Sequence, residues 1–401
     1  MALFIYKVKN DVGRTLVGIA EAENVKEVKR QFHVPDHFFI SARAYNSRHL
    51  ARIRLKLDDL LMFNNRLSCL VEAGVPILQA LSILWRQSEH HDVQIIVSYM
   101  REELEEGASL WEVFSAFPAA FPPIYLALIN VAEVGAGMAN ILKKLSQYLE
   151  DQKKFYSRLS RATMYPAFVL GFALLVLIGL FVFIVPTFEK VILRLHGELP
   201  FLSKVLFGIS NLLCNPYFDG AVVICVIIAL FLWRFLSKIE AYKYMLDYWK
   251  IKAPLLKNVL YPLSVARFTR SLSLLLGSGV PLVTAVEVCN TTINNSWLQK
   301  AVEDIRQNLL DGGSLYDAFK ITKAFPFMVV EMIGIGETGG KLQQLLEMAS
   351  AYLEEEADYA LTKYLTYLEP LMIIAVGAIV LFVLLGIYLP IFSIQSVLRT
   401  L

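Results

Sequence analysis

Charge and cysteine are scarce in this sequence. Only 18% of its 401 residues are charged and 56% are hydrophobic, a balance that indicates a polytopic membrane protein rather than a soluble domain. The four cysteines are scattered without a CxxC spacing, so neither a disulfide framework nor a zinc site gains support. The net charge is +2, and no basic block alternates with aromatic residues. The sequence therefore gives no case for a nucleic-acid partner.

Patterns typical of enzymes are missing as well. The sequence has no Ser/His/Asp order and no HExxH motif. The segment GIGETGG at 334–340 fits G-x-G-x-x-G through Gly334, Gly336 and Gly339, but a dinucleotide site needs a strand before this loop and a helix behind it. The neighbouring residues have helical spacing, which favours a tight turn between helices. We therefore expect no catalytic residues, no cofactor and no metal ion.

The N-terminus lacks the long apolar core of a cleaved signal peptide. We therefore expect the N-terminus to stay in the cytoplasm. Residues 1–50 contain two alternating stretches, then a stretch with helical spacing, and then a third stretch rich in aromatic residues. This pattern predicts a small α+β module with the order ββαβ.

Two long runs contain no charged side chain. Residues 167–185 and residues 371–389 are nineteen apolar residues each, long enough to cross a hydrocarbon core of about 30 Å as a helix. Pro166 and Pro370 precede the runs at a spacing of 204 positions. Each proline removes a helical hydrogen bond, so both are candidate helix-bend positions. Ion and proton pathways normally need polar groups at membrane depth, so the missing charge argues against such a pathway.

The two runs end two copies of one larger unit. FNNRLSCLVEAGVP at 63–76 aligns with FTRSLSLLLGSGVP at 268–281, and further matches follow at offsets of 205 and then 204 positions. Matches this dense, with a single gap placed in a loop, predict tandem repeats. In each copy, amphipathic stretches alternate with turn residues, which predicts six-helix bundles at 55–160 and 260–366.

Residues 220–236 form a third apolar run between the two copies. If both copies share one compartment, the chain must cross the membrane once more between them, and this run is the candidate. Ten lysines and arginines flank the bundle side of the spans and four flank the other side. The positive-inside bias therefore places both bundles in the cytoplasm. The 186–219 loop and the 390–401 tail are then periplasmic.

Two glutamates occupy equivalent turns of the two copies. Glu133 and Glu337 each follow an apolar helix and stand two positions before a glycine, Gly135 or Gly339. One interpretation is that each carboxylate caps backbone amides at the N-terminus of the next helix. The other is an exposed contact with a partner, or an oxygen ligand for a cation. The sequence leaves both interpretations open.

Two acidic runs, at 102–106 and 354–358, could suggest a metal cluster. Consecutive carboxylates on a helix point around its circumference and not towards one centre. We therefore interpret both runs as solvated helix faces. A surface for a basic partner is the alternative.

Together these features resemble one known family. They include the N-terminal ALFIYKV, the paired FxxxLxxLxxxGVP segments, GETGGKL with its weaker copy AEVGAGM, and the closing EPLMIIAVGAIVLFVLLGIYLPIF. The pattern covers essentially the whole chain and is similar to that of the type II secretion system F family, which includes the platform proteins of type IV pili. Members of this family usually have Gly-Glu in both copies. Ala132 precedes Glu133 here, so we expect the first turn to pack differently.

The resemblance implies a fold, a function and a location. It implies an all-α, multi-pass protein of the bacterial inner membrane, with two homologous cytoplasmic six-helix bundles, three transmembrane helices and no catalytic activity. Its implied role is the platform that couples a hexameric cytoplasmic ATPase to pilin or pseudopilin assembly and protein export. Other inner-membrane assembly proteins, the lipid bilayer and further copies of the chain are the remaining implied partners. The alternative is an oligomeric channel or transporter built from repeats.

Overall fold

The structure is a computed structural model that describes the following residues: 2–10, 13–31, 37–45, 47–194, 200–236 and 239–399. The chain is mostly helical and carries one small sheet. It forms two compact units, of which the first comprises Met1–Tyr156 and Leu260–Glu355, and the second Ser157–Val259 and Glu356–Leu401. Parts of the predicted 186–219 loop and 390–401 tail lie outside the described residues.

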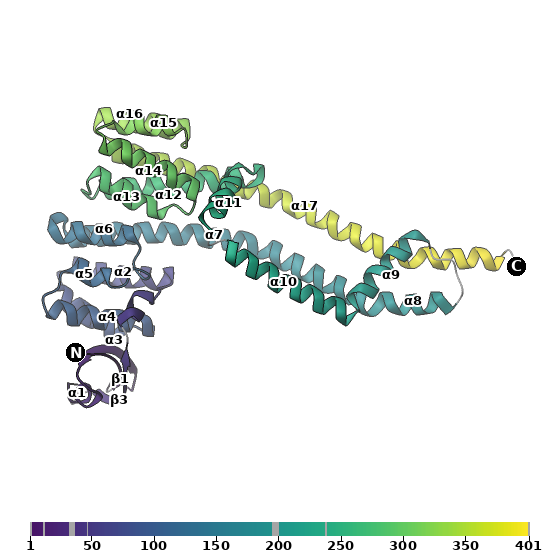
Figure 1. The fold of residues 1–401 in the computed structure, drawn as a ribbon, viewed down its shortest axis with the longest axis horizontal. Helices are drawn as coiled ribbons and strands as arrows, with labels where there is room; N and C mark the ends of the chain where they lie inside the picture. The colour runs from purple at the N-terminus through teal and green to yellow at the C-terminus, as the bar shows by residue number, and fades with distance from the viewer. Residues whose placement is uncertain are drawn as a thin grey trace. The chain divides into compact units, whose positions relative to one another are not determined.

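The N-terminal part of the first unit is a three-stranded antiparallel sheet with one helix, purple in Figure 1. The strand order is β2-β1-β3, so β1 is central. Val8, Leu16 and Ile19 are fully buried. The sheet confirms the predicted strands at the N-terminus. Its elements are β1 (Ala2–Asn10), β2 (Thr15–Ala22), α1 (Val25–Gln31) and β3 (His37–Tyr45), followed by the short 3-10 helix η1 (Ser47–Arg52).

Side chains of two helices close one edge of this sheet. The Gln94 Oε1 atom accepts a hydrogen bond from the Val17 amide at 3.0 Å, and the Ser98 Oγ atom accepts one from the Ile19 amide at 3.1 Å. The Trp85 Nε1 atom donates to the Val17 carbonyl at 2.8 Å. An unpaired strand edge is a site for unwanted pairing, so these three side chains take the place of a fourth strand.

Two sets of helices make up the rest of the first unit. The repeated Gly-Val-Pro turns start the second helix of each set, because Gly74 and Gly279 have φ of 80° and 88° and the following prolines cap the helices. The first set is α2 (Leu57–Glu72), α3 (Ile77–Gln87), α4 (His91–Glu105), α5 (Leu110–Ser115), α6 (Pro123–Val131) and the start of α7 (Met138–Gly179). The second is α12 (Pro254–Leu276), α13 (Leu282–Thr292), α14 (Ser296–Leu310), α15 (Leu315–Thr322), α16 (Phe327–Gly339) and the start of α17 (Leu342–Arg399).

Each set has an aromatic core made of equivalent residues. In the first, the rings of Phe114 and Phe121 lie 4.7 Å apart and contact Phe63. In the second, the rings of Phe319 and Phe325 lie 4.6 Å apart and contact Phe268. All six are buried, and burying one Phe side chain contributes about 1.5–3 kcal/mol. The phenylalanines that match between the copies are therefore the residues that pack each core.

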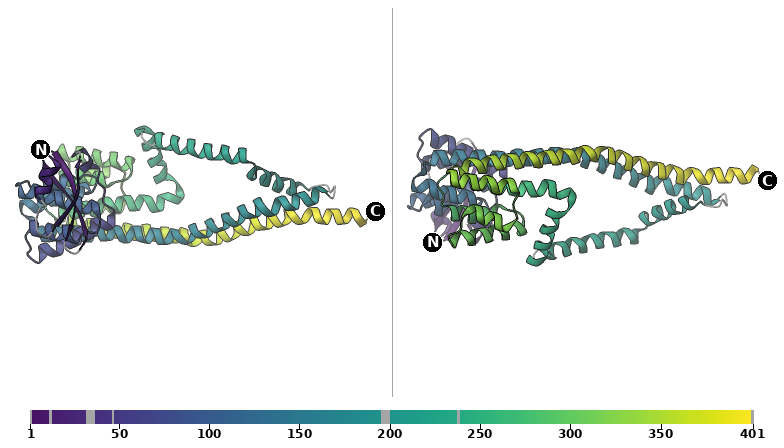
Figure 2. Two further views of the ribbon diagram at one scale, coloured as in Figure 1. Left: turned by 90° about the horizontal axis from the view of Figure 1, so that it is seen from below. Right: turned by 90° about the horizontal axis from the view of Figure 1, so that it is seen from above.

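The second unit contains the apolar parts of the long helices. Within the described residues, two helices are long and apolar enough to cross a membrane, Met138–Ile192 and Leu342–Leu389. Their later parts lie side by side in both views of Figure 2, and an ion pair joins Arg158 to Asp358. The other elements are the π-helical turn η3 (Leu180–Ile184), α8 (Val185–Arg194), α9 (Phe201–Leu213), α10 (Pro216–Leu236) and α11 (Glu240–Lys252).

A buried cluster fixes α9 against the two long helices of the second unit. The Ser203 hydroxyl donates to the Gly386 carbonyl at 2.7 Å, and the Ser210 hydroxyl donates to the Phe181 carbonyl at 2.6 Å. A Cβ on Gly386 would lie 2.6 Å from Leu206, so this glycine permits the close approach. Part of the segment predicted as a loop at 186–219 is thus a packed helix.

Candidate functional site

Glu337 binds the N-terminus of a short helix in the second copy. Its two carboxylate oxygens accept hydrogen bonds from the Leu315 amide at 2.8 Å and the Tyr316 amide at 2.9 Å. The Ser314 hydroxyl accepts a hydrogen bond from the Asp317 amide at 3.1 Å, so a third amide at this helix end also has a partner. Amides at a helix N-terminus have no partner within the helix, and the helix dipole favours a negative charge there.

Glu133 makes the equivalent contacts in the first copy. Its carboxylate accepts hydrogen bonds from the Leu110 amide at 2.8 Å and the Trp111 amide at 3.1 Å. Ser109 and Glu112 add a reciprocal capping box to the same helix end. In both copies the capped helix precedes the helix that carries the glutamate, whereas the sequence had suggested the following one. The reason is that α5 and α6, like α15 and α16, pack as neighbours, so the end of one helix meets the start of the other.

The glycines around Glu337 allow a tight turn into α17. Gly339 is the last residue of α16, and Gly340 follows in the left-handed conformation with φ of 65°. A Cβ on Gly336 would lie 2.8 Å from the Leu342 Cα atom. Since real Cβ atoms do not approach a backbone so closely, Gly336 lets the start of α17 pack directly on α16.

The first copy forms this turn differently. Ala132, at the position equivalent to Gly336, carries a Cβ, and the chain widens there into a π-helical turn, η2 (Ala132–Ala136). Gly135 lies within that turn. The left-handed residue before the next helix is Gly137, with φ of 78°. An alanine stands where Gly340 is in the second copy, so the left-handed conformation falls on the nearest glycine.

The glycines of the GIGETGG segment lie inside a helix. Gly334, Gly336 and Gly339 all belong to α16. A Cβ on Gly334 would lie 2.6 Å from the ring of Tyr316, so this glycine makes room for an aromatic side chain of α15. A phosphate-binding loop would connect a strand to a helix, and the segment has a different structure.

An open groove of about 540 Å³ lies beside Glu337. Its lining includes Tyr316, Glu331 and Ile335. The Ile335 side chain is 63% exposed, and the Tyr316 hydroxyl lies 3.3 Å from Glu331 Oε1. Glu337 also lines the groove, and both of its carboxylate oxygens already accept hydrogen bonds from backbone amides.

The two candidate bend prolines lie within helices. Pro166 is inside α7, and Pro370 lies within the bounds of α17. Near them, the Thr163 hydroxyl donates to the Leu159 carbonyl at 2.9 Å, and the Thr366 hydroxyl donates to the Thr362 carbonyl at 3.0 Å. Such bonds from a side chain to the preceding turn often accompany bent helices. The bends themselves remain a prediction.

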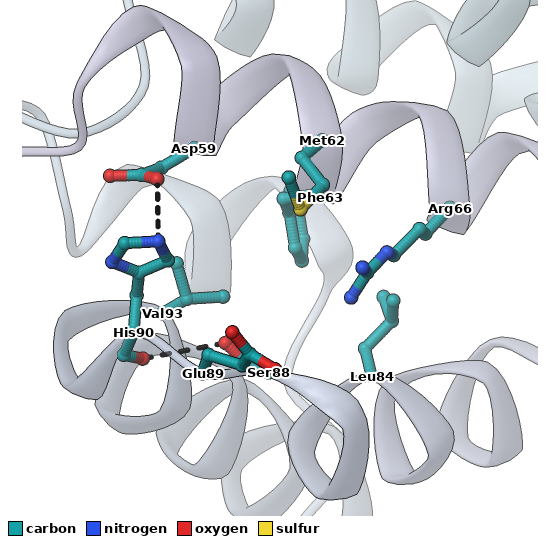
Figure 3. Close-up of a pocket in the computed structure, with 9 residues that line it drawn as sticks. All are labelled: Asp59, Met62, Phe63, Arg66, Leu84, Ser88, Glu89, His90 and Val93. Carbon is teal, nitrogen blue, oxygen red and sulfur yellow. Dashed lines mark hydrogen bonds and ion pairs between the residues drawn. The ribbon is translucent and has the colours of Figure 1, made fainter.

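A second pocket, of about 170 Å³, lies between α2, α3 and the start of α4 in the first copy. Figure 3 shows the Arg66 side chain pointing inwards from α2 towards Leu84 of α3, with Phe63 beside it on α2. At its rim, His90 Nε2 lies 3.2 Å from Asp59 Oδ1. The pocket thus combines an apolar floor with a charged rim.

The first acidic run is partly buried against the N-terminal module. Burial raises the pKa of Glu102 to about 8, with further increases from Glu106, Glu21 and Glu105, while Arg101 lowers it. Glu21 belongs to β2, and α4 packs on that strand. The expectation of a fully solvated face therefore does not hold for Glu102, because the N-terminal module covers part of this helix.

Two of these features could not be predicted from the sequence. Gln94 and Ser98 are four positions apart on α4, a spacing typical of one helix face, yet nothing in the sequence links them to β2. The pocket around Arg66 was missed as well. A comparison of the copies could have found it, because Arg66 aligns with Ser271 and Leu84 with Cys289.

Comparison with known proteins identifies one family along most of the chain. The model of the family described as "Type II secretion system (T2SS), protein F" matches residues 63–186 and again residues 268–390. These two matches correspond to the two copies of the repeated unit.

Full-length relatives carry names from two systems. The chain is 30% identical to the type IV pilus assembly protein PilC of Thermus thermophilus, over 98% of each chain. It is 29% identical to PilC of Pseudomonas aeruginosa, over 86% of this chain and 92% of the relative. It is also 27% identical to type II secretion system protein F of the same species, over 99% of each.

Proposed function

Because the chain belongs to the type II secretion system protein F family, we propose that it is the inner-membrane platform of a type II secretion or type IV pilus machine. In this role it couples a cytoplasmic assembly ATPase to the assembly of pilin or pseudopilin subunits, and it catalyses no reaction itself. One observation carries the proposal: α7 and α17 each run from a copy of the helical unit into an apolar segment long enough to cross a membrane.

The proposed topology has three spans, at 167–185, 220–236 and 371–389. Two of these segments lie in the helices that are apolar enough to span. The third, 220–236, lies in the 21-residue helix α10, which is the length that a span requires. The N-terminal module and both helical bundles, at 55–160 and 260–366, are then cytoplasmic, and the C-terminus is periplasmic.

The proposed mechanism is mechanical. A force that the ATPase applies to the cytoplasmic helices passes along α7 and α17, because a continuous helix transmits displacement along its axis. Pro166 and Pro370 are the positions where these helices would bend. The glutamate caps hold α5 and α15 in place, so each copy moves as one body. The other proposed partners are pilin or pseudopilin subunits, other inner-membrane assembly proteins and further copies of the chain.

The mechanical role predicts that a break in the helices uncouples the machine. Inserting Gly-Gly-Ser after Thr163 in α7 should abolish pilus assembly or secretion while the ATPase still co-purifies with the chain. The matched control is the same insertion after Asn215, between α9 and α10, which should preserve both. Normal assembly with the α7 insertion would contradict the mechanism.

Deletion of 55–160 should abolish ATPase association in a pull-down.

The topology predicts which residues a membrane-impermeant maleimide can reach in spheroplasts. In a cysteine-free background, Lys190→Cys should be labelled from outside, and Lys26→Cys should be labelled only after the membrane is opened. Labelling of Lys26→Cys in intact spheroplasts would overturn the orientation. Ion or solute flux in liposomes that contain the chain alone would instead favour a channel or transporter.

A further inference from the structure

The two copies contact each other through different faces. In the first copy the contact is made by α6 and α7, and in the second it is made by α12 and α13. The Lys144 ammonium donates to the Gly277 carbonyl at 2.6 Å, and an ion pair joins Asp151 to Arg270. Between them on α7, Tyr148 is only 9% exposed. This interface therefore joins unlike surfaces, as in a head-to-tail contact.

Tyr148 is the side chain that this interface buries. Burial raises its pKa, and Ser271 and Cys289 of the second copy are near enough to affect the titration of its phenol. Arg267 and Arg270 line one cavity together with Tyr148. Tyr148 thus fills a site built from α12 and α13.

The equivalent of Tyr148 in the second copy is exposed. A shift of 204 positions takes Tyr148 to Tyr352 and Lys144 to Met348. Tyr352 is 53% exposed and Met348 is 54% exposed, although both lie on the early part of α17. Two large side chains in a row on one helix face indicate a contact surface.

The equivalent of the site that Tyr148 fills is also open. A shift of 205 positions takes Ser271 back to Arg66, Cys289 back to Leu84 and Arg267 back to Met62. Arg66, Leu84 and Met62 all line the pocket in Figure 3. Met62 is 47% exposed. One chain therefore carries an exposed tyrosine, Tyr352, on its second copy. Its first copy carries an open pocket at the position equivalent to the site that Tyr148 fills.

Charge agrees with this match. Glu355, exposed on α17, is equivalent to Asp151, which pairs with Arg270 inside the chain. In the first copy, Asn65 is the residue equivalent to Arg270, so the matching position carries no charge. Arg66 stands next to Asn65 and supplies the positive charge that Glu355 requires.

We propose that Tyr352 of one chain inserts into the Arg66–Leu84 pocket of a second copy, repeating between chains the contact that Tyr148 makes within one. The ring packs on the apolar floor, and the guanidinium of Arg66 lies against its face. Each chain has one Tyr352 surface and one Arg66–Leu84 pocket. First and second copies of the repeated unit therefore alternate along the assembly. Such a contact closes into a ring or continues as a filament, depending on the rotation between copies.

Disulfide cross-linking tests the contact in membranes. Chains without native cysteines (Cys69→Ser, Cys214→Ser, Cys225→Ser and Cys289→Ala) carry either Arg66→Cys or Tyr352→Cys with different affinity tags. When the two chains are co-expressed and oxidised, the expected product is a covalent dimer that contains both tags. Each variant expressed alone should give no dimer, because the contact joins unlike surfaces.

The matched control pairs Tyr352→Cys with Glu303→Cys, a residue exposed on α14 away from the pocket. This pair should cross-link no more than background. Equal cross-linking of the control pair, or dimers formed by Arg66→Cys alone, would overturn the proposal.

Light scattering of the detergent-solubilised chain tests the same contact without a cross-link. Tyr352→Ala should weaken self-association by about tenfold or more, since tyrosines at the centre of an interface dominate binding. Its melting temperature should stay unchanged because the side chain is exposed. Phe327→Ala, which removes another exposed aromatic side chain of the second copy, is the control that should leave the mass unchanged. An unchanged mass distribution for Tyr352→Ala would contradict the proposal.

Discussion

In the first copy Phe114 is buried at the centre of an aromatic cluster, and in the second copy Phe319 occupies the same place. At the surface the copies diverge. Tyr148 is buried and Tyr352 is exposed, although both residues are tyrosines on equivalent helices. The sequence of a copy thus determines how its core packs, whereas the neighbours of that copy determine which surface residues become buried.

The largest expected effect tests the shared core. Phe114→Ala and Phe319→Ala should each lower the free energy of unfolding by about 3–5 kcal/mol, because each leaves a cavity among buried aromatic rings. Thermal unfolding of the solubilised chain, followed by near-UV circular dichroism, measures the loss. Phe327→Ala is the control and should have little effect because its ring is exposed. A large loss in one copy only would show that the two cores are not equivalent.

The next effect tests the difference between the turns. Gly336→Ala should cost about 1–3 kcal/mol, because the new Cβ would collide with the backbone of Leu342. The reverse change in the first copy, Ala132→Gly, should cost only about 0.5–1 kcal/mol through helix entropy. Melting temperatures of the two variants measure the contrast. Equal losses would mean that Gly336 does not control the packing of α17.

The glutamate caps should give a somewhat smaller and symmetric effect. Glu337→Ala and Glu133→Ala each remove an acceptor of two backbone amides, which should cost about 1–2 kcal/mol. The corresponding Gln variants retain one acceptor oxygen and should lose less. Thermal unfolding and ATPase pull-down are measured together. Normal stability with lost assembly would favour a partner contact over capping.

The smallest expected effect is a pH dependence of stability that arises from Glu102 in the first copy. Glu102 has its pKa raised from about 4.5 to about 8, mainly by burial, so the folded protein holds a proton there that the unfolded chain has lost. Stability should therefore fall as pH rises from about 4.5 towards 8. Glu102→Gln should remove this contribution and raise the melting temperature by a few degrees at pH 8.5, with no change at pH 4.

The second copy provides the control for this pH effect. Gln307 is the residue equivalent to Glu102 and is exposed on α14. Gln307→Glu should leave the pH dependence of the melting temperature unchanged, because a solvated carboxylate keeps its ordinary pKa. A shift as large as that of Glu102 would show that contact with the N-terminal module is not the cause.

The repeat, the helices and the small sheet could be predicted because they depend on local pattern. Matching phenylalanines and Gly-Val-Pro turns recur at a nearly constant offset. Apolar residues in a helix or strand also recur with the period of that element. Glu133 and Glu337 could be singled out for the same reason. Which amides they bind could not, because this depends on how α5 packs against α6 and α15 against α16.

Other features were beyond the reach of pattern reading. The predicted loop at 186–219 contains α9, whose Ser203 and Ser210 bond to backbone carbonyls of other helices. The widening of the chain at Ala132 required knowing how close α17 comes to Gly336 in the other copy. In each case the deciding contact joins residues far apart in the sequence, and a periodic pattern carries no information about such partners.

The side chains that close the sheet edge also set an order of events during synthesis. Val17 and Ile19 are made early, but the residues that accept their buried amides, Gln94 and Ser98, emerge from the ribosome almost eighty residues later. Until α4 has formed, these amides can bond only to water, and they find their buried partners when α4 packs on β2. The N-terminal strands must therefore wait for the fourth helix before the module can complete its fold, although they are the first part of the chain to be translated.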